Sequence, residues 1–222
     1  MPYPVSYYML LASLPHMPRT FDVEHVPISR LRLEQRLRML SARDAGTVEQ
    51  VQRFWLWDRQ HAERTDQEVR EEYDRLMTAI RNPLVRNIIA FRMDVRTITS
   101  ALRRRRLGMA PPEGVGRWVD QIHRHWDHPD FRLIREHPWI PALKADMEAN
   151  VPLQAERRLL QVTWNRWTRL SDDYHFSFEA LLLYLARWEI VDRWTRRNEQ
   201  LGCRRFETLL TEALGAHAPS HH

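Results

Sequence analysis

The chain has 222 residues, enough for one compact domain or two small ones. Its 34 basic and 29 acidic residues give a formal charge of only +5 and alternate along the chain, which argues against a nucleic-acid-binding protein. The single cysteine, Cys203, excludes a disulfide framework within one chain, and no apolar run reaches the roughly 20 residues that a membrane helix needs.

The first segment, residues 5–14, is apolar and aromatic and stops at Pro15. We interpret it as a strand or a short extended anchoring segment, and no later segment shows the alternation typical of strands. Ser29 is a candidate N-cap for a helix over residues 30–40. The rest of the chain therefore predicts an all-α fold.

Two capping boxes follow, and each predicts the start of a helix. Thr47 and Gln50 form a T-x-x-Q box for a helix that runs to about Ala62. Thr65 and Glu68 form a second box and open the next helix.

The next segment predicts one long helix, because its apolar residues lie alternately four and three positions apart. Pro83 suits the first helical position and Gly108 suits the C-terminal cap. Asp94 sits at the edge of the apolar stripe, where a carboxylate needs a partner. The stripe consists of Leu84, Ile88, Phe91, Val95, Ile98 and Leu102.

This helix ends in four consecutive arginines, namely Arg103, Arg104, Arg105 and Arg106. Cations at a helix C-terminus complement the helix dipole. The same run could also dock on an acidic partner surface, or on nucleic acid or anionic lipid.

The loop over residues 108–116 is rich in glycine and proline and is the best candidate boundary. It would separate an N-terminal helical unit, 1–110, from a C-terminal helical unit, 111–215, with a disordered tail at 216–222. The second unit is expected to contain helices at residues 118–126, 139–149, 152–170, 178–201 and 204–214. Leu153, Leu160, Trp164 and Trp167 should share one face of the third of these helices. Ser177 should cap the fourth, and Gly202 should end it.

A second acid, Asp192, falls inside an apolar helix face formed by Leu181, Leu185 and Trp188. An unpaired buried carboxylate is costly, so we expect it to meet an arginine or several backbone donors. The segment around it weakly repeats the plan of the long helix, since Glu189 precedes Gly202 much as Asp94 precedes Gly108.

The sequence gives only weak support for a metal site. His123, His125 and His128 do not have the i, i+4 spacing of helical zinc pairs, and Asp172, Asp173 and His175 lie in an interhelical turn. Neither a phosphate-binding glycine loop nor a nucleophile-elbow or zinc-protease motif is present. We therefore expect no enzyme activity, no metal and no cofactor; a helical enzyme built on these histidines and acids is the least favoured alternative.

Several segments together resemble an uncharacterised bacterial family found with V/A-type ATPase genes. They include YYMLLASLP, FRMDVRTITSALRRRRLG, HPDFRLIREHPWIP and the long segment from PLQAERRLL to DRWTRRN. That family is in turn similar to the C subunit of V/A-type rotary ATPases, an all-helical spacer built from repeated units. The motif that recurs in this spacer combines an acid, an Asn-Leu-Arg-like stretch and a basic-glycine ending. The partial matches here are Asp94, Arg96, Arg103 and Gly108, then Glu189, Arg193 and Gly202.

The resemblance implies a cytoplasmic, non-catalytic adapter in the central stalk of an ion-translocating ATPase. Such an adapter would bind the shaft subunits and the membrane ring without spanning the membrane, and would be peripheral to the inner membrane through the complex. The alternative is a helical scaffold that binds a different acidic partner through its arginine-rich helix ends.

Overall fold

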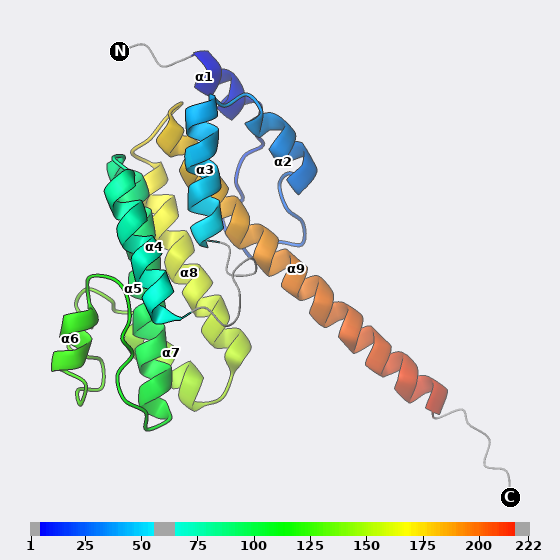
Figure 1. Ribbon diagram of the computed structural model, residues 1–222. Helices are drawn as coiled ribbons and strands as arrows, with labels where there is room; N and C mark the ends of the chain where they lie inside the picture. Colours follow the sequence, from blue (N-terminus) through cyan, green and yellow to red (C-terminus); the bar gives the residue numbers. More distant parts are fainter. Residues whose placement is uncertain (1–4, 56–64, 216–222) are drawn as a thin grey trace, which may run out of the picture.

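The computed structural model describes residues 5–55 and 65–215, and its regular secondary structure in those ranges is all helical, with no strand. The all-α expectation is therefore confirmed. The helices, coloured along the chain in Figure 1, are α1 (Val5–Ala12), α2 (Arg30–Leu37), α3 (Ala42–Trp55), α4 (Asp66–Ala79), α5 (Pro83–Arg106), α6 (Val119–Arg124), α7 (Ile140–Glu148), α8 (Pro152–Ser171) and α9 (Phe178–Gly215).

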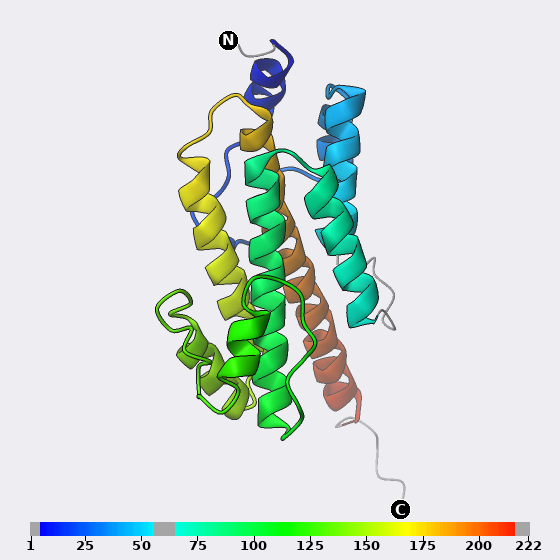
Figure 2. The same cartoon turned by 60° about the vertical axis from the view of Figure 1, so that its left-hand side comes forward.

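Helix α5 occupies the centre of the molecule. In Figure 2 it lies between α8 and α4, with α9 behind it. The larger core cluster joins α5, α8 and the first half of α9 to the N-terminal helices, and it contains the fully buried Trp167 and Trp188. A smaller cluster joins the end of α5 to α6 and α7 around Ile122 and Phe131. Among the described residues, no helix is long and apolar enough to cross a membrane.

The boundaries of α5 are the predicted ones. The Asn82 side chain accepts hydrogen bonds from the backbone amides of Leu84 (3.0 Å) and Val85 (3.2 Å), and Pro83 takes the first helical position. At the other end, Gly108 has φ +66°. The amide of Gly108 donates to the carbonyl of Arg105 (3.0 Å) and that of Met109 donates to Arg104 (2.9 Å). These two bonds form a Schellman motif, which needs a left-handed residue at Gly108.

The extended N-terminal segment was predicted wrongly, because residues 5–12 form helix α1. Tyr7 and Leu10, three positions apart, lie on one face of this helix and are buried. An apolar run without alternation fits a buried helix as well as a strand, and here the helical spacing decides which residues face the core.

Helix α3 begins earlier than predicted. The Ser41 hydroxyl accepts a hydrogen bond from the Asp44 amide (3.2 Å), so the helix starts at Ala42. Thr47 lies inside the helix and its hydroxyl donates to the Arg43 carbonyl (3.1 Å), so the expected cap at Thr47 is wrong. Its predicted end near residue 62 lies outside the described residues.

The capping box at the start of α4 is confirmed. The Glu68 amide donates to the Thr65 hydroxyl (3.2 Å), and the Thr65 amide donates to the Glu68 carboxylate (2.8 Å). Each residue thus satisfies a backbone donor at the helix start that would otherwise lack a partner.

Helix α9 continues through Gly202 to Gly215, so the predicted break at Gly202 is wrong. A glycine inside a helix costs only about 1 kcal/mol. The segment after Gly202 contains good helix formers, whereas Gly108 is followed by a proline-rich loop. The start of α9 is as predicted, because the Ser177 hydroxyl accepts a hydrogen bond from the Ala180 amide (3.3 Å).

The buried face of α8 is also mostly the predicted one. Leu160, Trp164 and Trp167 are buried, but Leu153, in the first turn, is 40% exposed. The first turn of α8 extends past the core, so its apolar residue gains no cover there.

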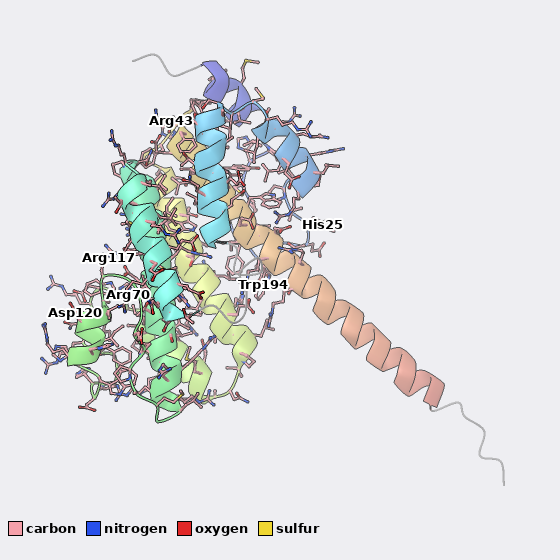
Figure 3. All side chains as sticks on the ribbon, viewed as in Figure 1. His25, Arg43, Arg70, Arg117, Asp120 and Trp194 are labelled. Carbon is pink, nitrogen blue, oxygen red and sulfur yellow. The ribbon has the colours of Figure 1, made fainter. Side chains whose placement is uncertain are left out.

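Two tryptophans fix the irregular segment between α1 and α2 on the first half of α9. The indole nitrogen of Trp188 donates to the Ile28 carbonyl (2.8 Å), and that of Trp194 donates to the Asp22 carboxylate (2.8 Å). Trp194 is labelled in Figure 3. Each tryptophan thus contributes apolar area to the core and a polar anchor to the surface segment.

Candidate functional site

Asp94, the acid in the middle of α5, is completely buried. Its carboxylate accepts hydrogen bonds from the Arg117 backbone amide (3.0 Å), from Nε of the Arg117 side chain (2.9 Å) and from a terminal guanidinium nitrogen. Arg117, labelled in Figure 3, lies in the loop that precedes α6. Asp94 therefore holds that loop against α5.

One helical turn further on, Thr97 continues this attachment. Its hydroxyl donates to the Val115 carbonyl (2.5 Å) and accepts from the Val115 amide (3.1 Å). The glycine- and proline-rich segment that separates the two predicted units thus lies along α5. The division of the chain near residue 110 stays a prediction.

Asp192 on α9 is 7% exposed and lies between two arginines, as its position in the apolar face predicts. Arg30 approaches one carboxylate oxygen at 2.8 Å and Arg196 approaches it at 2.9 Å. Arg30 also lies 3.7 Å from Glu189 and stacks over the Trp188 ring. Like Asp94, Asp192 joins its helix to a distant segment, here the start of α2.

The four-arginine run divides into two pairs. Arg104 donates to the Ala110 carbonyl (2.7 Å), and Arg105 donates to the backbone carbonyls of Asp127 (2.8 Å) and His128. These two side chains therefore hold neighbouring loops. Arg103 and Arg106 make no hydrogen bond or ion pair through their side chains to any described residue, and both line the hollow surface between α5, α8 and α9.

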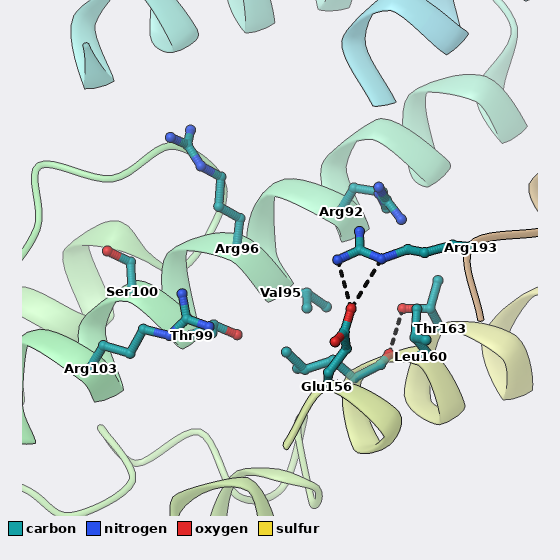
Figure 4. Close-up of a pocket in the computed structure, with 11 residues that line it drawn as sticks. Arg92, Val95, Arg96, Thr99, Ser100, Arg103, Glu156, Leu160, Thr163 and Arg193 are labelled. Atoms are coloured by element: carbon teal, nitrogen blue, oxygen red, sulfur yellow. Dashed lines mark hydrogen bonds and ion pairs between the residues drawn. The ribbon is translucent and has the colours of Figure 1, made fainter. Parts of the chain in front are cut away.

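This surface contains a groove of about 460 Å³, which we call the arginine groove. Figure 4 shows the walls: α5 contributes arginines from one side, and Arg193 reaches across from α9 toward α8. The lining side chains are Arg92, Val95, Arg96, Thr99, Ser100, Arg103, Glu156, Leu159, Leu160, Thr163 and Arg193. A second hollow of about 400 Å³ shares Arg103, Glu156, Leu159 and Arg193 with it and adds Arg106 and Arg197.

Glu156 is an acid in the lining of the groove. Arg193 and Arg197 each approach its carboxylate at 2.9 Å, and Arg96 lies 3.4 Å from Asp66 of α4. Burial, together with the positive charge of Arg193, lowers the pKa of Arg92 to about 10. Positive charge is therefore crowded at this surface.

Thr99 adds a polar group without a partner. Its side chain lines the arginine groove and is 7% exposed, and its hydroxyl oxygen is buried without a hydrogen bond. A buried hydroxyl normally has a hydrogen-bond partner, so the groove wall has one buried polar group whose hydrogen bond is not made.

The structure brings together some of the residues singled out in the sequence and separates others. Arg96 and Arg103 of the first repeat-like segment meet Arg193 of the second in the arginine groove. Asp94 and Asp192 lie in two separate ion pairs, and Gly202 lies within α9, where it ends no helix.

Sequence reasoning missed Arg92, Thr99 and Glu156. A usable signal existed on α5, because Arg92, Arg96, Thr99 and Arg103 repeat at helical spacing beside the apolar stripe. Glu156 had no such signal, since it comes from another helix.

The histidines and the acidic turn do not converge. His123 contacts the Pro112 carbonyl through Nε2 (2.7 Å), and His128 contacts Asp130 through Nδ1 (2.6 Å). Asp172 and Asp173 are exposed just after α8. Among residues 5–55 and 65–215, no cluster of three histidine, cysteine or acidic side chains has the geometry to hold a metal ion.

Comparison with known proteins gives one match. Residues 56–214 match the family described as "Protein of unknown function (DUF2764)", and this range is more than half of the chain. No curated protein and no solved structure matches.

Proposed function

The chain belongs to the DUF2764 family, and we propose that it is a non-catalytic adapter in the central stalk of a V/A-type ion-translocating ATPase. In this role it joins the rotating shaft to the membrane ring and takes part in ion transport without contacting the ion. The proposal combines the sequence resemblance to the spacer of the central stalk with the shape of the helical body.

The observation that carries the proposal is the course of α9. Its first half is buried against α8 and the rest of the core, up to Trp194 and Thr195. Its second half leaves the body, as Figure 1 shows. A helix anchored at one end and extended at the other gives an adapter two separate places to bind partners.

The two buried acids support a mechanical role. Asp94 fixes the loop before α6, and Asp192 fixes the start of α2, so segments distant in sequence are joined to the two longest helices. Close-packed interiors resist deformation, and such a body can transmit torque between partners.

The test is a binding experiment with purified shaft and ring subunits of a V/A-type ATPase. The full chain is expected to bind both, and a chain that ends after Asn198 is expected to keep its fold but lose one of the two partners. Full binding by the shortened chain would show that the extended half of α9 has no such role. ATP hydrolysis by the chain alone would contradict the non-catalytic assignment.

The second candidate is a scaffold that binds a different acidic protein through the arginine-rich end of α5. Only Arg103 and Arg106 are available for it, because Arg104 and Arg105 hold neighbouring loops. Alanine at 103 and 106 should then weaken binding in a salt-dependent way, since exposed charge contacts are screened.

A further inference from the structure

The arginine groove has a charge distribution that its own acids do not balance. Arg193 and Arg197 share Glu156, and Arg96 lies near Asp66. Arg103 and Arg106 have no carboxylate partner among the described residues. Like charges on α5 and α9 therefore face one another across a space that is large enough for a ligand.

We propose that the arginine groove binds a phosphorylated organic ligand, a role separate from that of the adapter. Its phosphate would lie between Arg103 on α5 and Arg193 on α9. Its organic part would lie on the apolar floor formed by Val95, Leu159 and Leu160.

The guanidinium groups of the groove favour a phosphate group over a simple counter-ion. The guanidinium group presents a planar fork of donors that matches two oxygens of a phosphate. Figure 4 shows the guanidinium groups entering the groove from two helices, so donors approach from more than one side. A phosphate monoester presents three terminal oxygens in different directions to such donors, whereas a carboxylate presents two.

The Thr99 hydroxyl supports a ligand in the groove independently of the arginine charges. Its hydroxyl is buried, unsatisfied and part of the groove wall. A small acceptor that enters the groove would satisfy it. Since the hydroxyl is already withdrawn from water, this hydrogen bond would form at little additional desolvation cost.

Burial and the charge of Arg193 also depress the pKa of Arg92. A bound anion would favour the protonated form of this side chain and raise its pKa again. The crowded positive charge of the groove is thus relieved when an anion occupies it.

The size of the groove distinguishes a small ligand from an acidic peptide. Its volume of about 460 Å³ lies within the range of small-molecule sites, which mix an apolar lining with a few polar groups.

The experiment measures binding to the full chain by calorimetry and by the shift in melting temperature. The probes are ATP, glucose 6-phosphate, inorganic pyrophosphate, vesicles that contain phosphatidic acid, and a glutamate-rich peptide. At least one organic phosphate should bind more tightly than pyrophosphate. The probe with the highest affinity then identifies the source of the phosphate. Nucleotide and sugar phosphate represent soluble ligands, and the vesicles represent a lipid headgroup.

Two variants separate ligand binding from folding. Thr99→Val removes only the unsatisfied hydroxyl, so the melting temperature of the free protein should stay the same or rise while the ligand-induced shift falls. Arg103→Ala should weaken binding about tenfold or more, as loss of a charge-assisted hydrogen bond does. Arg86→Ala is the matched control, because Arg86 is exposed on the same helix and lies outside the groove.

Four results would overturn the proposal. They are binding of no organic phosphate at low salt, binding of the acidic peptide alone, pyrophosphate binding with no gain from an organic part, and equal loss of affinity in Arg86→Ala and Arg103→Ala. The last result would reveal non-specific attraction to a basic chain.

Discussion

Arg117 donates to the buried carboxylate of Asp94 through both its backbone amide and its guanidinium group. The pair joins residues 23 positions apart and connects the middle of α5 to the loop that follows this helix. Asp94 is completely buried, whereas the Arg117 side chain is about half exposed, so water can hydrate an arginine that has lost the acid more readily than an acid that has lost the arginine.

Asp94→Ala is expected to lower the free energy of unfolding by about 1–3 kcal/mol, the usual cost of leaving donors without an acceptor, because the half-exposed Arg117 side chain can be hydrated. It leaves the Arg117 guanidinium and backbone amide without their acceptor. Urea denaturation measures the effect. Asp173→Ala, at an exposed carboxylate, is the control and should stay within about 0.5 kcal/mol. Equal midpoints for the two variants would show that Asp94 does not hold the loop against α5.

Gly116→Ala should destabilise the protein by about 1–3 kcal/mol, the usual cost of a strained backbone conformation. Gly116 has φ +121°, and a Cβ there would lie 2.9 Å from the Asp94 carboxylate. Gly46→Ala is the opposite case, because Gly46 lies in α3 and a Cβ there would meet nothing within 4 Å. It should stabilise by about 0.5–1 kcal/mol. Thermal unfolding of both variants checks the contrast, and a neutral Gly116→Ala would mean that the loop does not lie against Asp94.

Much of the helical framework could be predicted because its boundaries depend on local chemistry. The residues at both ends of α5, and the Thr65–Glu68 box, satisfy backbone groups within a few positions of themselves. Gly202 failed as a stop signal because a lone glycine without a following proline or loop only weakens a helix. Helix α1 was not predicted, because the periodicity of so short an apolar run does not distinguish a helix from a strand.

The arginine groove could be predicted only in part. The polar face of α5 is visible in the sequence as Arg92, Arg96 and Arg103 at helical spacing. Its pairing with Arg193 and Glu156 depends on how α5, α8 and α9 pack, and contacts between segments so distant in the chain leave no local pattern.

Asp192→Ala should destabilise by about 1–3 kcal/mol, because Arg30 and Arg196 lose their acceptor but are exposed enough to be hydrated. The effect should be largest locally at α2, because Arg30 at its start pairs with Asp192. Hydrogen exchange of the α2 amides measures this. An unchanged exchange rate in α2, together with an unchanged melting temperature, would show that the N-terminal segment is held without this ion pair.

His137 should make stability fall in mild acid. Burial lowers its pKa below the ordinary value of 6.5, and its ring lies 5.5 Å from those of Trp118 and Trp139. The folded state therefore prefers the neutral ring, so its contribution is present above about pH 6.5 and is lost as the pH falls through the lowered pKa. Urea unfolding at pH 7.5 and pH 5 measures the loss. His137→Leu should reduce the difference between the two pH values, and an equal difference in the variant would assign the acid sensitivity to other groups.

The proposed role of the protein as an adapter between the shaft and the membrane ring of a V/A-type ATPase can be tested in its native host. Affinity purification of the tagged full chain from its native host, followed by mass spectrometry at several salt concentrations, tests it most directly. We expect shaft and ring subunits of the ATPase to copurify with the chain. If Arg103 and Arg106 face an acidic partner, replacing both with alanine should make this recovery less sensitive to salt. Recovery of a consistent unrelated partner, with no ATPase subunits at any salt concentration, would reject the adapter role in favour of a general scaffold.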